Sequence, residues 1–212
     1  MGVAIRVAGE DDRELVVRLL DDAFQDDPVS GWVFPGTEYR RTTHHRLMSA
    51  FTDAVLADGR IDVTEDGTAC ALWLSMPGEA HPADGEDQDD HGGGDEGGGE
   101  DEAVALREFV DPDNERVETI ARLMAESHPT GRAHAYLWMI AVTPDRQGEG
   151  LGAALIGHVL DRCDREGLPA YLEASSERST KLYERLGYTR TATTLDLPDG
   201  PRMYPMWREP RP

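Results

Sequence analysis

The fold is decided by one stretch, Trp138-Met-Ile-Ala-Val142-Thr-Pro-Asp-Arg-Gln147-Gly148-Glu149-Gly150-Leu-Gly152-Ala-Ala-Leu-Ile156. An apolar strand ends in a turn, and Gly-x-Gly-x-Gly then opens a helix. Free N–H groups at a helix start bind anions, and glycines let a phosphate approach the backbone. The stretch therefore predicts a phosphate-binding strand–loop–helix. It is not a P-loop, because no Gly-Lys-Ser/Thr follows, and its glycine spacing fits a dinucleotide fingerprint poorly.

Strands and helices alternate on both sides of this stretch. Apolar periodicity and turn residues predict strands at 3–8, 60–64, 68–75, 133–142, 170–174, 188–197 and 202–207. The same criteria predict helices at 10–24, 39–56, 103–110, 114–127, 150–166 and 177–186. Such alternation is typical of an α/β or α+β fold with one sheet, here of about seven strands.

Charge is the most unusual feature of the composition. The 212 residues hold 42 Asp and Glu against 21 Lys and Arg, a net charge of −21. Residues 84–102 alone hold ten acidic residues and seven glycines and no apolar side chain. We expect a single domain, 1–212, with a disordered acidic, Gly-rich loop at about 79–102. This loop is either a solvated linker, which we favour, or a charged lid that attracts cationic substrates.

Several classes of protein are disfavoured. The negative charge repels phosphates, so we expect neither nucleic acid nor an anionic membrane as a partner. Two cysteines, Cys70 and Cys163, cannot form a disulfide framework or a Cys-rich zinc site, and the seven histidines lack metal-ligand spacing, so we expect no metal. No long apolar run is present, and residues 10–14 are charged where a signal peptide would be apolar. We expect a cytoplasmic protein.

The decisive stretch resembles a known family. Gln147-x-x-Gly150-x-Gly152 after a strand ending Ile140-Ala141-Val142 resembles the acetyl-CoA signature of the GNAT N-acetyltransferases. The resemblance continues through residues 172–175 and 182–188, and it covers nearly everything except the acidic loop. It implies a mixed, mostly antiparallel sheet splayed around an acetyl-CoA cleft, with helices on both faces. Within the family, residues 143–152, 171–175 and 197–202 are similar to the puromycin N-acetyltransferases.

The resemblance also implies which residues hold acetyl-CoA. The end of the strand would bind the pantetheine arm, and an N–H there would polarise the thioester carbonyl. The glycine loop would wrap the pyrophosphate. Glu149 departs from the family pattern, which is often basic at this position, so its carboxylate must point away from the phosphates or weaken binding. The cofactor-binding candidates are Ile140, Ala141, Val142, Gln147, Gly148, Glu149, Gly150, Leu151, Gly152, Ser176 and Ser179.

Two catalytic residues follow from the same resemblance. Tyr183 matches the family tyrosine that protonates the departing thiolate, and a phenol with a pKa near 10 is protonated at neutral pH. Its alternative is a ring packed in the core. Glu173 stands where some relatives carry a catalytic glutamate, and burial on an apolar strand would make it a better base. Its alternative is a structural carboxylate paired with an arginine such as Arg178.

Histidines offer further candidates for the base. His128 and His134 precede the cofactor strand and rank behind Glu173. His44 and His45 lie in a helix expected to border the acceptor pocket, and we expect them to be structural.

The sequence thus predicts an N-acetyltransferase that moves an acetyl group from acetyl-CoA directly to a primary amine. The acceptor is expected to be a small, cationic metabolite or antibiotic, since a net charge of −11 remains without the acidic segment. We expect a monomer or homodimer. The alternatives are an acetyltransferase for protein N-termini or lysines, and a non-catalytic acyl-CoA-binding module.

Overall fold

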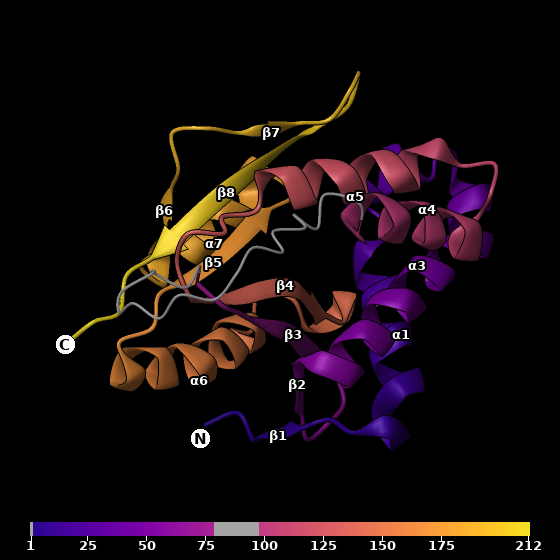
Figure 1. The fold of residues 1–212 in the computed structure, drawn as a ribbon. Helices are drawn as coiled ribbons and strands as arrows, with labels where there is room; N and C mark the ends of the chain where they lie inside the picture. The colour runs from indigo at the N-terminus through magenta and orange to yellow at the C-terminus, as the bar shows by residue number, and fades with distance from the viewer. Residues whose placement is uncertain (1, 79–97) are drawn as a thin grey trace, which may run out of the picture.

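The computed structural model describes residues 2–78 and 98–212, which form one sheet with helices packed on both faces (Figure 1). The strands are β1 (Ile5–Val7), β2 (Arg60–Thr64), β3 (Ala69–Met76), β4 (His134–Val142), β5 (Ala170–Ala174), β6 (Thr189–Arg190), β7 (Leu195–Asp196) and β8 (Arg202–Arg208). The α-helices are α1 (Arg13–Phe24), α2 (Pro28–Val33), α3 (Thr37–Asp58), α4 (Gly98–Val110), α5 (Glu115–Ser127), α6 (Leu151–Glu166) and α7 (Glu177–Arg185). Two short 3-10 helices, Glu10–Asp12 and Pro144–Arg146, precede α1 and α6.

The sheet opens between two of its central strands. Its order is β1-β2-β3-β4-β5-β8-β6, with β7 paired to β8, and every pairing is antiparallel except β4 with β5. These two parallel strands share only two residue pairs, Ala135 with Ala170 and Tyr136 with Tyr171. From Leu137 onward, β4 therefore has no strand partner on that side in the described part of the chain. This splayed edge is the geometry that the family resemblance implied.

Both faces of the sheet are buried because successive side chains of a strand point to opposite sides. On β3, Cys70 and Leu72 pack in a core cluster with α1, α3 and α5. Ala71 and Trp73 of the same strand pack in a second cluster with α6 and α7. The α/β fold class with helices on both faces is confirmed.

Three local predictions need correction. The predicted strand 188–197 is split into β6 and β7, so the described sheet has eight strands instead of about seven. The short helix α2 was not predicted. The helix α4 begins at Gly98, so residues 98–102, which were predicted to belong to the loop, are helical. Acidic residues in the first turn of α4 favour its dipole, and Glu100 pairs with Arg122 at 3.1 Å. The remainder of that loop prediction, residues 79–97, lies outside the described residues.

Within the described ranges, none of the helices combines the length and the apolar character needed to span a bilayer. Cys70 and Cys163 are both buried free thiols.

Candidate active site

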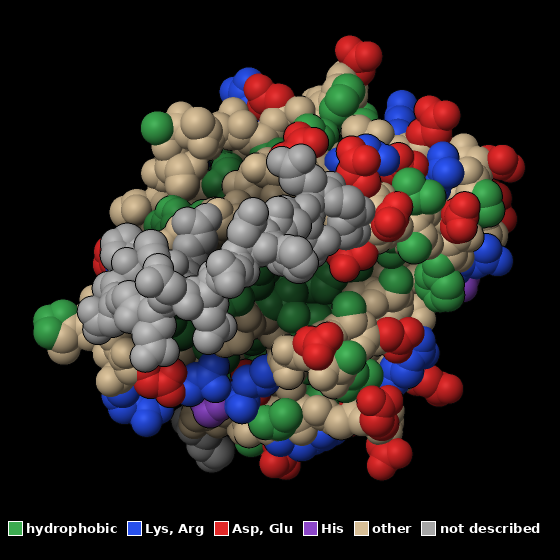
Figure 2. Space-filling view, viewed as in Figure 1, with side chains coloured by type: hydrophobic (Ala, Val, Ile, Leu, Met, Phe, Trp, Pro, Cys, Tyr) green, Lys and Arg blue, Asp and Glu red, His purple; other side chains and the backbone are tan. Residues whose placement is uncertain are grey.

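A cavity of about 1300 Å³ lies where β4 and β5 separate. Residues from α1 to α5 line one side of it, and the β4–α6 loop and α7 line the other. Figure 2 shows hydrophobic side chains inside a hollow on this face of the molecule. The splayed strands thus place the glycine-rich loop and the candidate catalytic side chains around one space.

The glycine-rich loop has a backbone that only glycine adopts easily. Gly148 and Gly150 have φ angles of +85° and +87°, in the left-handed region where a Cβ is unfavourable. Gly150 is the N-cap of α6, and no side chain caps this helix. The amide side chain of Gln147 donates to the carbonyl of Val142 at 3.3 Å and closes the turn. The first N–H groups of α6 are consequently left to bind an anion.

Glu149 turns toward an arginine of its own loop. The Nε of Arg146 donates to Glu149 Oε2 at 2.7 Å, and a terminal nitrogen of Arg146 donates to Asp66 at 3.3 Å. Arg146 lines the cavity and Glu149 does not. The carboxylate expected to repel phosphates is therefore paired with Arg146 and is not part of the cavity wall.

Most of the predicted cofactor residues line the same cavity. These are Ile140, Val142, Gln147, Gly148, Gly150, Leu151, Gly152, Ser176 and Ser179. The side chain of Ala141 is buried on the opposite face of β4, as strand alternation requires. The Ser176 hydroxyl caps α7 by accepting from the Ser179 N–H at 3.2 Å, and the Ser179 hydroxyl donates to the Ser176 carbonyl at 2.8 Å. Both serines thus stabilise the start of α7 and also line the cavity.

Tyr183 lies on α7 with its side chain against the cavity. Burial, and then the nearby negative charge of Asp27, raises the pKa of Tyr183 to about 12. Its ring packs against that of Tyr188, with centroids 6.0 Å apart. No described residue accepts a hydrogen bond from its hydroxyl. The phenol is therefore protonated at neutral pH and has a proton to donate.

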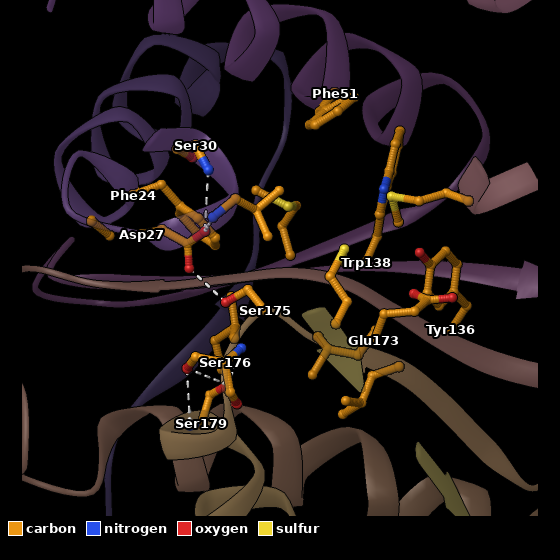
Figure 3. A pocket seen from close by; sticks show the side chains of 18 of the residues that line it. Phe24, Asp27, Ser30, Phe51, Tyr136, Trp138, Glu173, Ser175, Ser176 and Ser179 are labelled. Atoms are coloured by element: carbon orange, nitrogen blue, oxygen red, sulfur yellow. Dashed lines mark hydrogen bonds between the residues drawn. The ribbon is translucent and has the colours of Figure 1, made fainter. Parts of the chain in front are cut away.

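Glu173 is a buried carboxylate with an unpartnered oxygen. Its side chain is 2% exposed, and its Oε1 has no hydrogen-bond partner among the described residues. The arginine pairing considered for Glu173 is absent from the described structure, and its neighbour is instead the ring of His128, whose Nδ1 lies 3.8 Å from Oε1. Glu173 lies beside Tyr136 (Figure 3). Burial, followed by the charge of Glu173, raises the pKa of Tyr136 well above its usual value.

Two histidines follow Glu173 in a series of contacts: His128 lines the cavity and His134 does not. Burial lowers the pKa of His134, so its ring is neutral at pH 7. Its Nδ1–H donates to the Arg132 carbonyl at 2.7 Å, which leaves Nε2 as an acceptor, 3.1 Å from Nε2 of His128. His128 then donates through Nε2 and presents Nδ1 to Glu173. The sequence named both histidines but could not show that they contact each other.

A serine of α2, a histidine of α3 and an aspartate of α1 form a hydrogen-bonded series. The Nε2 of His44 lies 3.0 Å from the Ser30 hydroxyl, and its Nδ1 lies 2.7 Å from Asp21. This order matches a nucleophilic triad. However, the neighbouring N–H groups of Val29 and Ser30 already donate to the Asp27 carboxylate, at 2.8 and 3.3 Å, so they are not available to stabilise an oxyanion. We interpret His44 as a structural link between α1, α2 and α3.

Asp27 is a site residue that the sequence analysis missed. Its carboxylate caps α2, lines the cavity and accepts from the Ser175 hydroxyl at 2.5 Å (Figure 3). Burial raises the pKa of Asp27 even though these hydrogen bonds oppose the shift. The signal was present in the sequence, because an aspartate directly before Pro28 is typical of a helix start.

Comparison with known proteins agrees with this geometry. Residues 73–188 match the acetyltransferase (GNAT) family. Mycothiol acetyltransferase of Paenarthrobacter aurescens is 29% identical over 169 residues, which cover 71% of this chain and 50% of that protein. [Ribosomal protein bS18]-alanine N-acetyltransferase of Escherichia coli is 44% identical over 57 residues, or 26% of this chain and 38% of that protein. The chain spans at most half the length of these curated relatives.

A solved structure has the same fold over the whole chain. It is described as histone acetyltransferase HPA2 and related acetyltransferase from Corynebacterium glutamicum. Its TM-score is 0.70 at 23% identity, and the match covers 100% of this chain and 98% of that one. The family match, the splayed sheet and the glycine loop lead to one conclusion: the chain belongs to the acetyltransferase (GNAT) family.

Proposed function

We propose that this chain transfers the acetyl group of acetyl-CoA to the primary amine of a small molecule. The observation that carries the proposal is a pair of groups on one cavity, the buried and incompletely bonded carboxylate of Glu173 and the protonated phenol of Tyr183. An amine must lose a proton as it attacks an acyl group, and a thiolate must gain one as it leaves. The cavity offers a group for each transfer.

The residues around the cavity are suited to acetyl-CoA. Residues 147–152 and the free N–H groups at the start of α6 would hold the pyrophosphate, with Arg146 beside them. The unpaired edge of β4 beyond Leu137 offers backbone groups for the pantetheine arm. Acetyl-CoA, when bound, supplies a thioester as the acyl donor.

Glu173 would act as the base. Its Oε1 lacks a hydrogen-bond donor among the described residues, so it can accept the proton of the amine directly or through one water. His128, at 3.8 Å, is the next group that could take that proton onward. The hydroxyl of Tyr183 would hold a proton for the sulfur of the departing thiolate.

One alternative acceptor has a specific observation behind it. The Escherichia coli relative is named for acetylating an alanine of ribosomal protein bS18, and the similarity extends over 57 residues. A protein N-terminus is therefore the second candidate. The subfamily resemblance to puromycin N-acetyltransferases, a role in antibiotic resistance, the cytoplasmic location, the absence of a metal and the oligomeric state remain predictions.

The test measures turnover directly. The protein is incubated with acetyl-CoA and a panel of amines that includes puromycin and an alanine-initiated peptide, and both free CoA and the mass of acetylated product are followed. We expect acetylation of at least one small amine. Glu173→Gln should lower kcat/KM at least about hundredfold at unchanged acetyl-CoA affinity. Glu108→Gln, an exposed glutamate on α4, is the matched control and should change nothing. Binding of acetyl-CoA without turnover of any amine would indicate a non-catalytic binding module instead.

A further inference from the structure

Charges of opposite sign lie on opposite sides of the cavity. The arginines that line it, Arg146, Arg178 and Arg185, all come from the β4–α6 loop and α7. Among the described residues on the side formed by α1 to α5 and the facing part of β5, the charged lining groups are carboxylates: Asp27, Glu102 and Glu173. The arginine side is suited to the phosphates of a cofactor, and the carboxylate side is suited to a cation.

The carboxylate side is otherwise walled by large apolar side chains. Phe24, Phe51, Trp138 and Met124 line it, and each is only partly buried, so each presents surface to the cavity. The rings of Phe51 and Trp138 lie 4.5 Å apart. Figure 3 shows Phe51 on the opposite side of the pocket from Ser176 and Ser179, so this apolar wall is separate from the capped start of α7.

The carboxylates and the apolar side chains on this side of the cavity together limit which acceptors can bind. When a ring or alkyl group lies against these walls, its apolar surface is removed from water, and this burial strengthens binding. A hydroxyl placed against these walls would lose its water without gaining a partner there. An ammonium is favoured at the end of the pocket where Glu173 lies, and aromatic faces attract cations further.

We propose that the acceptor is an amine with an apolar, aromatic body, which lies against Phe51 and Trp138 and presents its amine to Glu173. This inference rests on the proposed function and deepens it. It narrows the acceptor from any small cation to one that carries an aromatic body next to the reacting nitrogen.

Matched ligands separate the two requirements. Binding to the CoA-loaded protein is measured by calorimetry for 2-phenylethylamine, ethanolamine, cadaverine and 2-phenylethanol, and the amines are assayed with acetyl-CoA in parallel. We expect 2-phenylethylamine to bind at least about tenfold more tightly than ethanolamine, because only it buries a ring. It should also bind more tightly than 2-phenylethanol, which lacks the charge, and than cadaverine, which lacks the ring.

Variants then test whether the aromatic ring of the ligand lies against Phe51. Phe51→Ala should weaken 2-phenylethylamine about tenfold and leave ethanolamine unchanged. Phe109→Ala is the matched control, because Phe109 is 57% exposed on α4 and does not line the cavity. Phe51→Leu, which keeps an apolar side chain and removes the ring, replaces Phe51→Ala if the latter does not fold.

Each outcome decides a separate point. Equal or tighter binding of ethanolamine or cadaverine, or an unchanged affinity in the phenylalanine variants, overturns the inference. Tight binding of 2-phenylethylamine without acetylation of any amine supports the pocket and contradicts the proposed function. Acetylation of ethanolamine in preference to 2-phenylethylamine does the reverse.

Discussion

At Tyr183, burial and charge act in the same direction. Both disfavour the phenolate, and together they raise the pKa to about 12. The phenol thus stays protonated over the whole neutral range and well into alkaline pH. A weak acid in that state can give a proton to a thiolate without losing it to solvent first.

Tyr183→Phe keeps the ring and its packing and removes only the hydroxyl. Because general acid catalysis typically contributes about 10²–10⁴-fold, kcat should fall at least about tenfold while the affinity for acetyl-CoA stays nearly constant. Steady-state kinetics and calorimetry measure the two quantities. Tyr188→Phe is the matched control, since that buried tyrosine lies outside the cavity wall and its hydroxyl has no described partner. An undiminished kcat in Tyr183→Phe would show that solvent protonates the thiolate.

The C-terminal strand is fastened to α6 by one buried ion pair. Arg208 on β8 is 3% exposed, and both of its terminal nitrogens donate to the Asp164 carboxylate at 2.7 Å. The backbone N–H of Arg211 donates to the same carboxylate at 2.7 Å, and Arg208 Nε donates to the carbonyl of Leu186 after α7. The pair therefore joins three elements that surround β5 and its Glu173.

Asp164→Asn should lower the free energy of unfolding by about 2–4 kcal/mol at pH 7, because it leaves a buried guanidinium without its counter-ion. The hydrogen bonds from Arg208 hold the pKa of Asp164 at about 2, below its ordinary value of 3.8. A lowered folded-state pKa stabilises above the unfolded value, so the contribution is complete above about pH 4 and is lost as pH falls toward 2. Urea unfolding at several pH values measures this.

Asp161→Asn, exposed on the same helix, controls for the change of charge and should shift stability by less than about 0.5 kcal/mol. A difference between the wild type and Asp164→Asn that stayed constant down to pH 2 would contradict the assignment of the shifted carboxyl.

Elements with a strong local signal could be predicted from the sequence. The β4–loop–α6 unit carries its own glycines and apolar stripe, and the β2–β3 hairpin carries its own turn. The helix α2 was missed because six residues are too few to show a helical period, so only the cap at Asp27 marks it. The start of α4 was missed because Gly98 and Gly99 disfavour a helix locally, and packing against α5 outweighs that preference.

In the candidate site too, residues in local motifs could be predicted from the sequence, and contacts between distant segments could not. Gly148 and Gly150 lie in one contiguous motif, at 143–152, and Tyr183 lies in another, at 182–188; all three line the cavity. The contacts of Glu173 with His128, and of Asp27 with Ser175, join segments 45 and 148 positions apart, and no local pattern contains them. Such contacts depend on where β4 and β5 separate, which is a property of the assembled sheet.

Over the whole molecule, negative charge is in large excess but unevenly placed. Residues 79–97 hold eight of the 42 acidic side chains. The cavity, in contrast, has arginines from the β4–α6 loop and α7 on one side and carboxylates on the other. Local charges a few ångströms from a ligand outweigh distant ones in salt solution, since the Debye length is about 10 Å at 0.1 M. Binding should therefore depend mainly on the cavity and only weakly on the net charge.

Changing every Asp and Glu within residues 79–97 to Asn and Gln tests this without altering chain length. We expect folding and kcat to be preserved, with thermal stability unchanged or slightly higher because like charges are removed. At low salt the KM of a cationic acceptor should rise at most about threefold, and the KM of the anionic acetyl-CoA should fall instead. Both effects should vanish at 1 M salt, where the Debye length is about 3 Å. A rise of more than about tenfold in acceptor KM at low salt, reversed by salt, would show that the segment captures the acceptor. Loss of folding would show that its carboxylates stabilise the domain.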